Sequence, residues 1–191
     1  MAANNDRIVS FDDEPLVLVD DEDRELGFCP KAEAHAGEGR LHRAFSLFVF
    51  NSAGELLVQQ RAAHKPLWPG YWSNTVCSHP RRGERMDDAV RRRLREEIGL
   101  EVELRFLFKF QYRARYGEAG TEHELCWVYV GHSDAAPRLN PTEVAAFRYL
   151  SPPQLDAAMA EAPGAFTPWF RQEWARIRRD HADVLLTRSG A

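Results

Sequence analysis

A single strongly amphipathic helix in the middle of the chain constrains the fold most. The segment ERMDDAVRRRLREEIGL, residues 84–100, carries apolar side chains at helical spacing, at Met86, Ala89, Val90, Leu94 and Ile98. Asp87 and Asp88 lie in its first turn, where acidic groups complement the helix dipole, and Gly99 ends it. Strand-like runs lie before the helix and again after it, and helical segments come last. The sequence therefore predicts an α+β fold.

The other elements are predicted from apolar runs and turn residues. We expect a helical turn at 31–36, strands at 16–20, 40–51, 55–62, 101–113, 122–131 and 144–150, and helices at 152–163 and 166–186. The strands at 40–51 and 55–62 flank the turn NSAG and are predicted to form a hairpin. Residues 64–83 are too rich in proline, glycine and tryptophan for regular structure, and long loops inside compact domains are usually functional.

Length and composition narrow the class of protein. The 191 residues suggest one domain, expected at 15–180, with a flexible lead-in at 1–14 and a tail at 181–191. A net charge of −4 and a pI near 6.0 argue against nucleic acid as a partner of the whole molecule. We find neither a signal peptide nor an apolar run approaching the roughly 20 residues that span a membrane. Three widely spaced cysteines favour free thiols in a reducing cytoplasm.

Two glutamates lie close together in the predicted strand TEHELCWVYV. Since strand side chains alternate, Glu122 and Glu124 point to one face, and Cys126 follows on that face within an apolar run. Two carboxylates on an interior face repel each other unless they hold a metal or share a proton. From this segment alone, an exposed polar strand end is an equally good interpretation, and Cys126 is best explained as a small buried apolar residue.

Three of the seven histidines could join these carboxylates. His35 and His42 flank a glycine-containing turn, and His79 lies in the long loop two residues after Cys77. Three imidazoles and two carboxylates can form an octahedral site for Mn²⁺, Mg²⁺ or Zn²⁺. The spacing alone gives little support, because the five ligands are not local in sequence.

The central helix also contains most of a Nudix box, the motif that lays carboxylates along a helix face to bind Mg²⁺ on a pyrophosphate. Read from Ser78, the matching residues are Glu84, Arg92, Leu94, Glu96, Glu97, Gly99 and Leu100. Two positions depart from the motif, since Ser78 replaces its first glycine and Arg93 replaces a glutamate. Outside this pattern, Glu96 and Glu97 could equally form a solvated helix end paired with neighbouring arginines.

Further stretches make the chain resemble the type 1 isopentenyl-diphosphate isomerases, a Nudix-fold family. They are RLHRAFS, LLVQQRAAHKPLWPGYWSN, TVCSHP, YRARY, EHELC and FTPW, and the resemblance covers residues 15–175. It implies a Nudix-like mixed β-sheet core with flanking helices. It also implies interconversion of isopentenyl diphosphate and dimethylallyl diphosphate by protonation and deprotonation, a 1,3-allylic rearrangement in isoprenoid biosynthesis.

The resemblance gives catalytic roles to residues of this chain. Cys77 and Glu124 match the two groups that give and take the proton, and either could be the acid in the forward direction. Tyr112 matches a tyrosine that assists proton delivery, and Trp169 an aromatic ring that stabilises a carbocation. Three aromatic residues of the long loop either help to exclude water or simply pack the loop, namely Trp68, Tyr71 and Trp72.

The resemblance also implies two metal sites and an anion-binding site. The residues that match the ligands of one ion, Mn²⁺, Mg²⁺ or Zn²⁺, are His35, His42, His79, Glu122 and Glu124. A second ion, Mg²⁺ on the diphosphate, would be held by Glu97 and the backbone carbonyl of Cys77. The positions that grip the diphosphate are Lys31, Arg61, Lys65 and Arg93. In this interpretation Arg93 turns the position of a metal-binding glutamate into an anion clamp.

Two rival functions are open at this point. The first is a Nudix pyrophosphohydrolase of a nucleoside or related diphosphate, which release of inorganic phosphate or pyrophosphate would reveal. Arg93 argues against it, and so does the pairing of Cys77 with Glu124, which hydrolysis does not require. The second is a binding module with a catalytically dead Nudix fold, which predicts missing catalytic residues, and none is missing. The isomerase implies a small-molecule substrate and no nucleic-acid or membrane partner. The sequence leaves the oligomeric state open, and a monomer is consistent with it.

Overall fold

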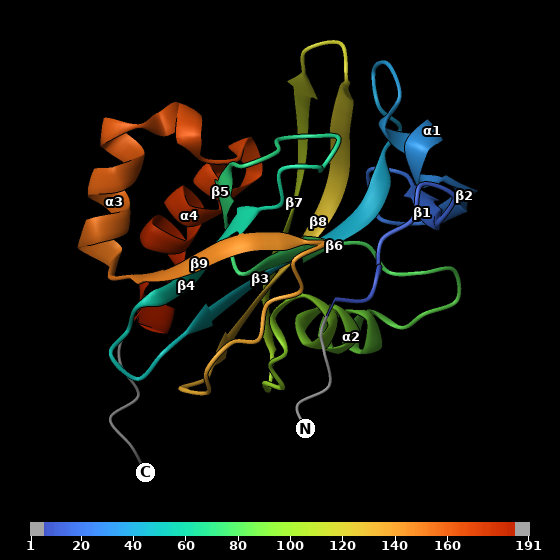
Figure 1. The fold of residues 1–191 in the computed structure, drawn as a ribbon. Coiled ribbons are helices and arrows are strands. Elements are labelled where there is room, and N and C mark those ends of the chain that lie inside the picture. The colour runs from blue at the N-terminus through green and yellow to red at the C-terminus, as the bar shows by residue number, and fades with distance from the viewer. Residues whose placement is uncertain (1–5, 186–191) are drawn as a thin grey trace.

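Strands β3 and β8 form the centre of a nine-stranded mixed sheet in the computed structural model, which describes residues 6–185 (Figure 1). The elements are β1 (Pro15–Val19), β2 (Glu25–Pro30), α1 (Lys31–His35), β3 (His42–Phe50), β4 (Leu56–Arg61), β5 (Trp72–Ser73), β6 (Val76–Ser78), α2 (Met86–Ile98), β7 (Arg105–Tyr116), β8 (Gly120–His132), β9 (Val144–Leu150), α3 (Pro152–Glu161) and α4 (Pro168–Asp180). Short 3-10 helices lie at Pro163–Ala165 and Ala182–Leu185. The α+β prediction is confirmed.

Strand β3 has neighbouring strands on both sides. Almost all of its residues are buried, as expected for a strand in the interior of a sheet. It runs parallel to β8, with His42 opposite Glu124. It also runs antiparallel to β6, where Ser46 lies opposite Cys77. The predicted hairpin of β3 with β4 exists only next to its turn, because β4 then pairs with β5 and β9.

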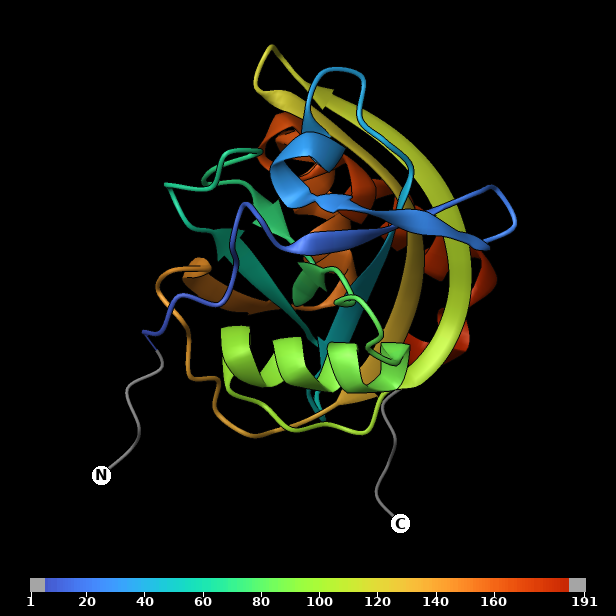
Figure 2. The same ribbon diagram turned by 90° about the vertical axis from the view of Figure 1, so that its right-hand side faces the viewer.

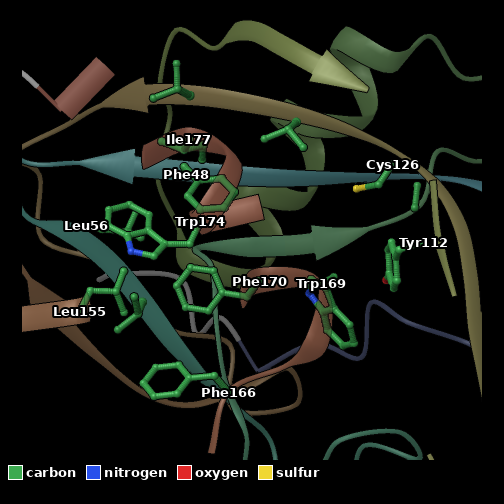
Figure 3. Close-up of a cluster of buried hydrophobic side chains, with 14 of the residues drawn as sticks. Phe48, Leu56, Tyr112, Cys126, Leu155, Phe166, Trp169, Phe170, Trp174 and Ile177 are labelled. Atoms are coloured by element: carbon green, nitrogen blue, oxygen red, sulfur yellow. The ribbon is translucent and has the colours of Figure 1, made fainter. Parts of the chain in front are cut away.

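The two faces of the sheet carry separate apolar layers, because successive side chains of β3 point to opposite faces. One layer is shared with α2 and contains Phe45, Leu47, Val49, Val90, Leu94 and Ile98. The other is shared with α3 and α4 and contains Phe48, Leu56, Leu155, Phe170, Trp174 and Ile177 (Figure 3). In Figures 1 and 2, α2 lies apart from α3 and α4, with the sheet between them. The predicted central helix is confirmed, and Gly99 ends it in the left-handed conformation with φ of 69°.

Three local predictions need correction. Strand β2 was not expected, because Gly27 and Pro30 interrupt its pattern, which suits an edge strand that pairs only with β1. The loop at 64–83 contains the short strands β5 and β6, which pair with β4 and β3. The last helix is shorter than the predicted 166–186, because it begins at Pro168 and ends at Asp180.

Residues 6–14, part of the predicted lead-in, contact the domain at several points. The side chain of Val9 is buried, and Asn140 Nδ2 donates to the carbonyl oxygen of Arg7 at 2.8 Å. The backbone N–H groups of Lys31 and Ala32 bond the carbonyls of this segment. Residues 1–5 lie outside the described residues, as does the predicted tail beyond 185. Within 6–185, no helix combines the length and apolarity required to cross a membrane.

Candidate active site

Four separate segments bring the five predicted metal-binding residues together. Helix α1 ends at His35, β3 begins at His42, His79 follows β6, and β8 carries Glu122 and Glu124. Four are buried and the side chain of His35 is 12% exposed, and one ligand atom from each lies within 4.8 Å of the others. The parallel pairing of β3 with β8 fixes the centre of this cluster.

Gly120, at the start of β8, allows the backbone of α1 to come close. Its φ is 151°, and a Cβ there would lie 2.7 Å from the carbonyl oxygen of His35. Any other residue would be strained in this conformation and would push His35 away from Glu122. The glycine therefore helps to position one imidazole of the cluster.

The donor atoms of the cluster lie within hydrogen-bonding distance of one another, as between His79 Nε2 and Glu124 Oε1 at 3.1 Å. His42 Nδ1 lies 2.8 Å from the carbonyl oxygen of Arg40 and so carries the ring proton, which leaves a lone pair on Nε2. This Nε2 lies 3.2 Å from Nε2 of His79. His35 Nε2 and Glu122 Oε2 form an ion pair at 2.8 Å, and neither atom has a further hydrogen-bond partner among the described residues. Three imidazole nitrogens and two carboxylates in this state fit a divalent metal ion.

The protonation states of His79 and of the two carboxylates suit metal ligation. Burial and the nearby His42 lower the pKa of His79 well below its ordinary value, so its ring is neutral. Burial alone would raise the pKa of Glu122, but the charge and hydrogen bond of His35 and the charge of His79 together lower it. The pKa of Glu124 is lowered in the same way, with burial offset by the hydrogen bond and charge of His42. The hydrogen bond and charge of Glu124 outweigh burial and raise the pKa of His42, so a metal ion bound here would replace a proton on that ring.

A cavity beside the cluster brings the predicted catalytic groups together. Cys77, Tyr112, Glu124 and Trp169 all line it. The hydroxyl of Tyr112 donates to Oε2 of Glu124 at 2.7 Å. The rings of Tyr112 and Trp169 lie side by side at one end of the apolar layer, with centroids 5.9 Å apart (Figure 3). The cavity thus combines a thiol, a carboxylate with its phenol, and an aromatic wall.

The thiol of Cys77 is held in its protonated form. The amide N–H₂ of Asn74 donates to two backbone carbonyls, so Oδ1 faces the thiol and accepts from Sγ at 2.8 Å. The indole N–H of Trp169 donates to Sγ at 3.0 Å. Burial, with the charge of Glu173 next in effect, raises the pKa of Cys77 to about 12. The resting site therefore pairs a neutral thiol with an ionised Glu124.

The aromatic residues of the long loop support this cavity from behind. Trp68 is buried and packs edge-on against Trp169, with ring centroids 5.1 Å apart. None of Trp68, Tyr71 and Trp72 is among the residues that line the cavity. This geometry favours the packing interpretation over direct exclusion of water from the site.

Four cationic side chains border the same cavity, and they are the predicted diphosphate contacts: Lys31, Arg61, Lys65 and Arg93. The guanidinium of Arg61 is fixed by the carbonyl oxygens of Leu67 and Trp68 at 2.9 and 3.1 Å. Lys65 forms an ion pair with Glu143. These contacts hold the cations in place before any ligand arrives, which suits an anion-binding wall.

Glu97 lies next to this wall and not in the metal cluster. Its Oε1 accepts hydrogen bonds from Nε and Nη2 of Arg93 at 3.0 and 2.6 Å, and both side chains are buried. The interpretation as a solvated helix end is therefore wrong for Glu97. Glu96 stays partly exposed and pairs with Arg92. Glu97 does not line the cavity, so its role toward a second metal stays a prediction.

Sequence reasoning missed Glu173, a fully buried carboxyl on α4 beneath the catalytic cavity. Its Oε1 lies 3.6 Å from Sγ of Cys126, and its Oε2 has no hydrogen-bond partner among the described residues. Burial raises its pKa to about 8. The sequence pattern could have indicated that Glu173 is buried, because it follows Trp169 by one helical turn and interrupts the apolar stripe of the helix.

Replacing Glu173 with glutamine is expected to change how stability depends on pH. Because its folded pKa of about 8 exceeds the ordinary 4.5, the folded chain binds this proton more tightly than the unfolded chain. The free energy of unfolding therefore falls as pH rises between these values, by at most about 1.4 kcal/mol per pH unit. Glu173→Gln should remove this loss and gain roughly 2–4 kcal/mol relative to wild type between pH 5 and 8.

Urea unfolding of the metal-free proteins across that pH range measures this difference. The exposed Glu161 on α3 supplies a matched control, and Glu161→Gln should run parallel to wild type at every pH. Parallel curves for Glu173→Gln and wild type would contradict a raised pKa at Glu173.

The chain is similar in sequence and in fold to known proteins. A NUDIX domain matches residues 40–170. Isopentenyl-diphosphate Delta-isomerase 1 of Photorhabdus laumondii is 46% identical over 174 residues, which cover 90% of this chain and 99% of that relative. The isopentenyl-diphosphate Delta-isomerase of Burkholderia multivorans is 51% identical over 158 residues, which cover 83% of this chain and 89% of the relative. Among solved structures, DR0079 from Deinococcus radiodurans superposes with a TM-score of 0.73 at 29% identity, covering 87% of this chain and 100% of that chain.

Proposed function

Because this chain belongs to the NUDIX-domain family and, within it, to the isopentenyl-diphosphate Delta-isomerases, we propose that it interconverts isopentenyl diphosphate and dimethylallyl diphosphate. One structural observation supports this proposal independently of the family relationship. Cys77 and the Tyr112–Glu124 pair line one cavity that is bordered by four cations. A proton donor, a proton acceptor and an anion-binding wall are the groups that this isomerisation requires.

The proton balance of the reaction assigns roles to these groups. A proton adds to the terminal carbon of the alkene, a tertiary carbocation forms, and the neighbouring carbon loses a proton to make the new double bond. Cys77 and Glu124 act as the donor and acceptor, in an order set by the direction of the reaction, and Tyr112 passes protons to and from Glu124. The ring of Trp169 stabilises the cation through its electron-rich face.

The cationic wall holds the diphosphate at the other end of the substrate. Lys31, Arg61, Lys65 and Arg93 supply charge-assisted hydrogen bonds to its oxygens. These residues orient the five-carbon chain so that its double bond lies between the proton donor and the proton acceptor. Remote binding energy of this kind is spent on positioning the reacting carbons.

Two metal sites complete the proposal. The residues that would hold the first ion, Mn²⁺, Mg²⁺ or Zn²⁺, are His35, His42, His79, Glu122 and Glu124. When bound, it supplies positive charge that stabilises the anionic form of Glu124 and neutralises repulsion between the two carboxylates. A Mg²⁺ on the diphosphate would be held by Glu97 and the carbonyl of Cys77. Glu97 is suited to this because both hydrogen bonds from Arg93 go to Oε1, leaving Oε2 as a ligand.

We also propose that the enzyme acts in the cytoplasm on a small-molecule substrate, with no need for a second subunit. The three cysteines are all free, which agrees with a reducing compartment. Every group given a role above comes from a single chain.

Phosphorus NMR of isopentenyl diphosphate incubated with the protein and Mg²⁺ tests the reaction class. An isomerase leaves the diphosphate intact, so the product should keep two coupled phosphorus resonances while its carbon skeleton changes. Appearance of orthophosphate or inorganic pyrophosphate at the rate of substrate loss would instead identify a NUDIX pyrophosphohydrolase.

A further inference from the structure

The segment 7–14, which precedes the first strand, runs along the rim of the active-site cavity. We refer to it as the N-terminal strap. At one end, the side-chain amide of Asn140 donates a hydrogen bond to the carbonyl oxygen of Arg7. In the middle of the strap, the side chain of Val9 is buried. At the other end, the carbonyl oxygens of Asp12 and Glu14 accept the backbone N–H groups of Ala32 and Lys31. The strap is thus anchored to the loop before β9 and to the first turn of α1.

Between these anchors the strap contacts two members of the cationic wall. The ammonium of Lys31 donates to Oγ of Ser10 at 2.5 Å. Nη1 of Arg93 donates to the carbonyl oxygen of Val9 at 2.8 Å. These contacts join two cations that are far apart in sequence, one from α1 and one from α2, through consecutive residues of the strap. A loose leader would not make both contacts.

Ser10 is the strap residue that reaches the cavity itself, where it lines the wall beside the cations. Its oxygen accepts a hydrogen bond from Lys31, which leaves its own hydroxyl proton for another acceptor. Within residues 6–185, no hydrogen-bond acceptor is found for that proton. An O–H donor next to an ammonium, facing a cavity rimmed by guanidinium groups, matches the oxygen atoms of a diphosphate.

We propose that the N-terminal strap is the outer wall of the diphosphate site, with Ser10 donating its hydroxyl proton to a diphosphate oxygen and the Val9 carbonyl fixing the orientation of Arg93. This inference rests on the proposed function and deepens it by adding a substrate-binding residue. The strap does not reach Cys77, Glu124 or Tyr112 in any contact that the structure gives. Its contribution is therefore to binding of the diphosphate and not to proton transfer.

This role predicts that loss of the Ser10 hydroxyl changes KM and leaves kcat nearly unchanged. An interaction made equally in the ground state and the transition state changes KM and leaves kcat unaltered. A hydrogen bond to a charged group corresponds to about ten-fold or more in affinity. Ser10→Ala should therefore raise KM for isopentenyl diphosphate about ten-fold at nearly constant kcat. Ser10→Thr, which keeps the hydroxyl, should restore most of the loss.

The experiment combines steady-state kinetics with calorimetric titration of inorganic pyrophosphate into wild type, Ser10→Ala, Ser10→Thr and the control Ser52→Ala. Ser52 lies in the exposed turn between β3 and β4, outside the cavity. The expected result is weaker pyrophosphate binding and a higher KM for Ser10→Ala alone. Unchanged binding and KM, or a change only in melting temperature or in kcat, would overturn the proposal.

The experiments distinguish failure of the proposed isomerase function from failure of the proposed role of the strap. Pyrophosphate binding reports on the strap whether or not the protein isomerises its substrate. A wild-type protein that binds pyrophosphate through Ser10 yet leaves isopentenyl diphosphate unchanged would reject the reaction and keep the strap. Deletion of residues 1–10 provides a second variant, for which tighter pyrophosphate binding would mean that the strap obstructs the site, and would reject our inference.

Discussion

Cys77→Ala is expected to reduce isomerisation of isopentenyl diphosphate by about 10³-fold or more while the protein stays folded. Acid–base groups contribute about 10²–10⁴-fold to such reactions, and alanine leaves nothing at this position to carry the proton. The fold should survive because β6 is held by its backbone pairing with β3 and by Asn74, which bonds backbone carbonyls. Turnover measured by conversion to dimethylallyl diphosphate gives the effect.

The chain offers a matched control for this thiol. Cys29 lies on β2 in a separate apolar cluster, so Cys29→Ala should keep full activity. Metal content and the melting curve of Cys77→Ala should match those of wild type. Comparable turnover by Cys77→Ala would remove Cys77 from the mechanism.

His42→Ala is expected to strip the metal cluster of its bound ion. His42 is fully buried, it lies opposite Glu124 across the parallel strand pair, and its lone pair faces His79. Loss of even an outer-shell partner commonly weakens metal binding by 10–100-fold, so loss of a ligand should cost about 100-fold or more. Activity should fall with the metal, because the carboxylates are then left to repel each other.

Elemental analysis after dialysis against a weak chelator measures the stoichiometry. The exposed His64 is the control, and His64→Ala should retain as much metal as wild type. An unchanged metal content in His42→Ala would mean that the five-residue cluster is not the metal site.

The sequence predicted those parts of the fold that depend on local periodicity. The stripe from Met86 to Ile98 identified α2 because helix spacing repeats within a few residues. The alternation of Glu122 and Glu124 identified a shared face for the same reason. The partners of β3 could not be read in this way, because pairing with β8 and β6 joins segments far apart in the chain. The nearby β4 was the local guess, and it holds only at the turn.

The candidate site, like the fold, was predicted only in part from the sequence. The resemblance supplied residue types, and the structure brings twelve of them to one cavity and its adjoining cluster: Lys31, His35, His42, Arg61, Lys65, Cys77, His79, Arg93, Tyr112, Glu122, Glu124 and Trp169. Ser10 was missed because its polar, acidic surroundings look like solvent-exposed chain, and only the contact with Lys31 reveals its place. Glu173 was missed because a carboxyl in a helix is ordinarily exposed.

Proton NMR of isopentenyl diphosphate incubated with the protein and Mg²⁺ in D₂O tests the central claim most directly. If Cys77 and Glu124 exchange their protons with solvent and shuttle them to carbon, deuterium should enter the allylic and methyl positions while dimethylallyl diphosphate forms. An unchanged spectrum from folded, metal-loaded protein would contradict the account.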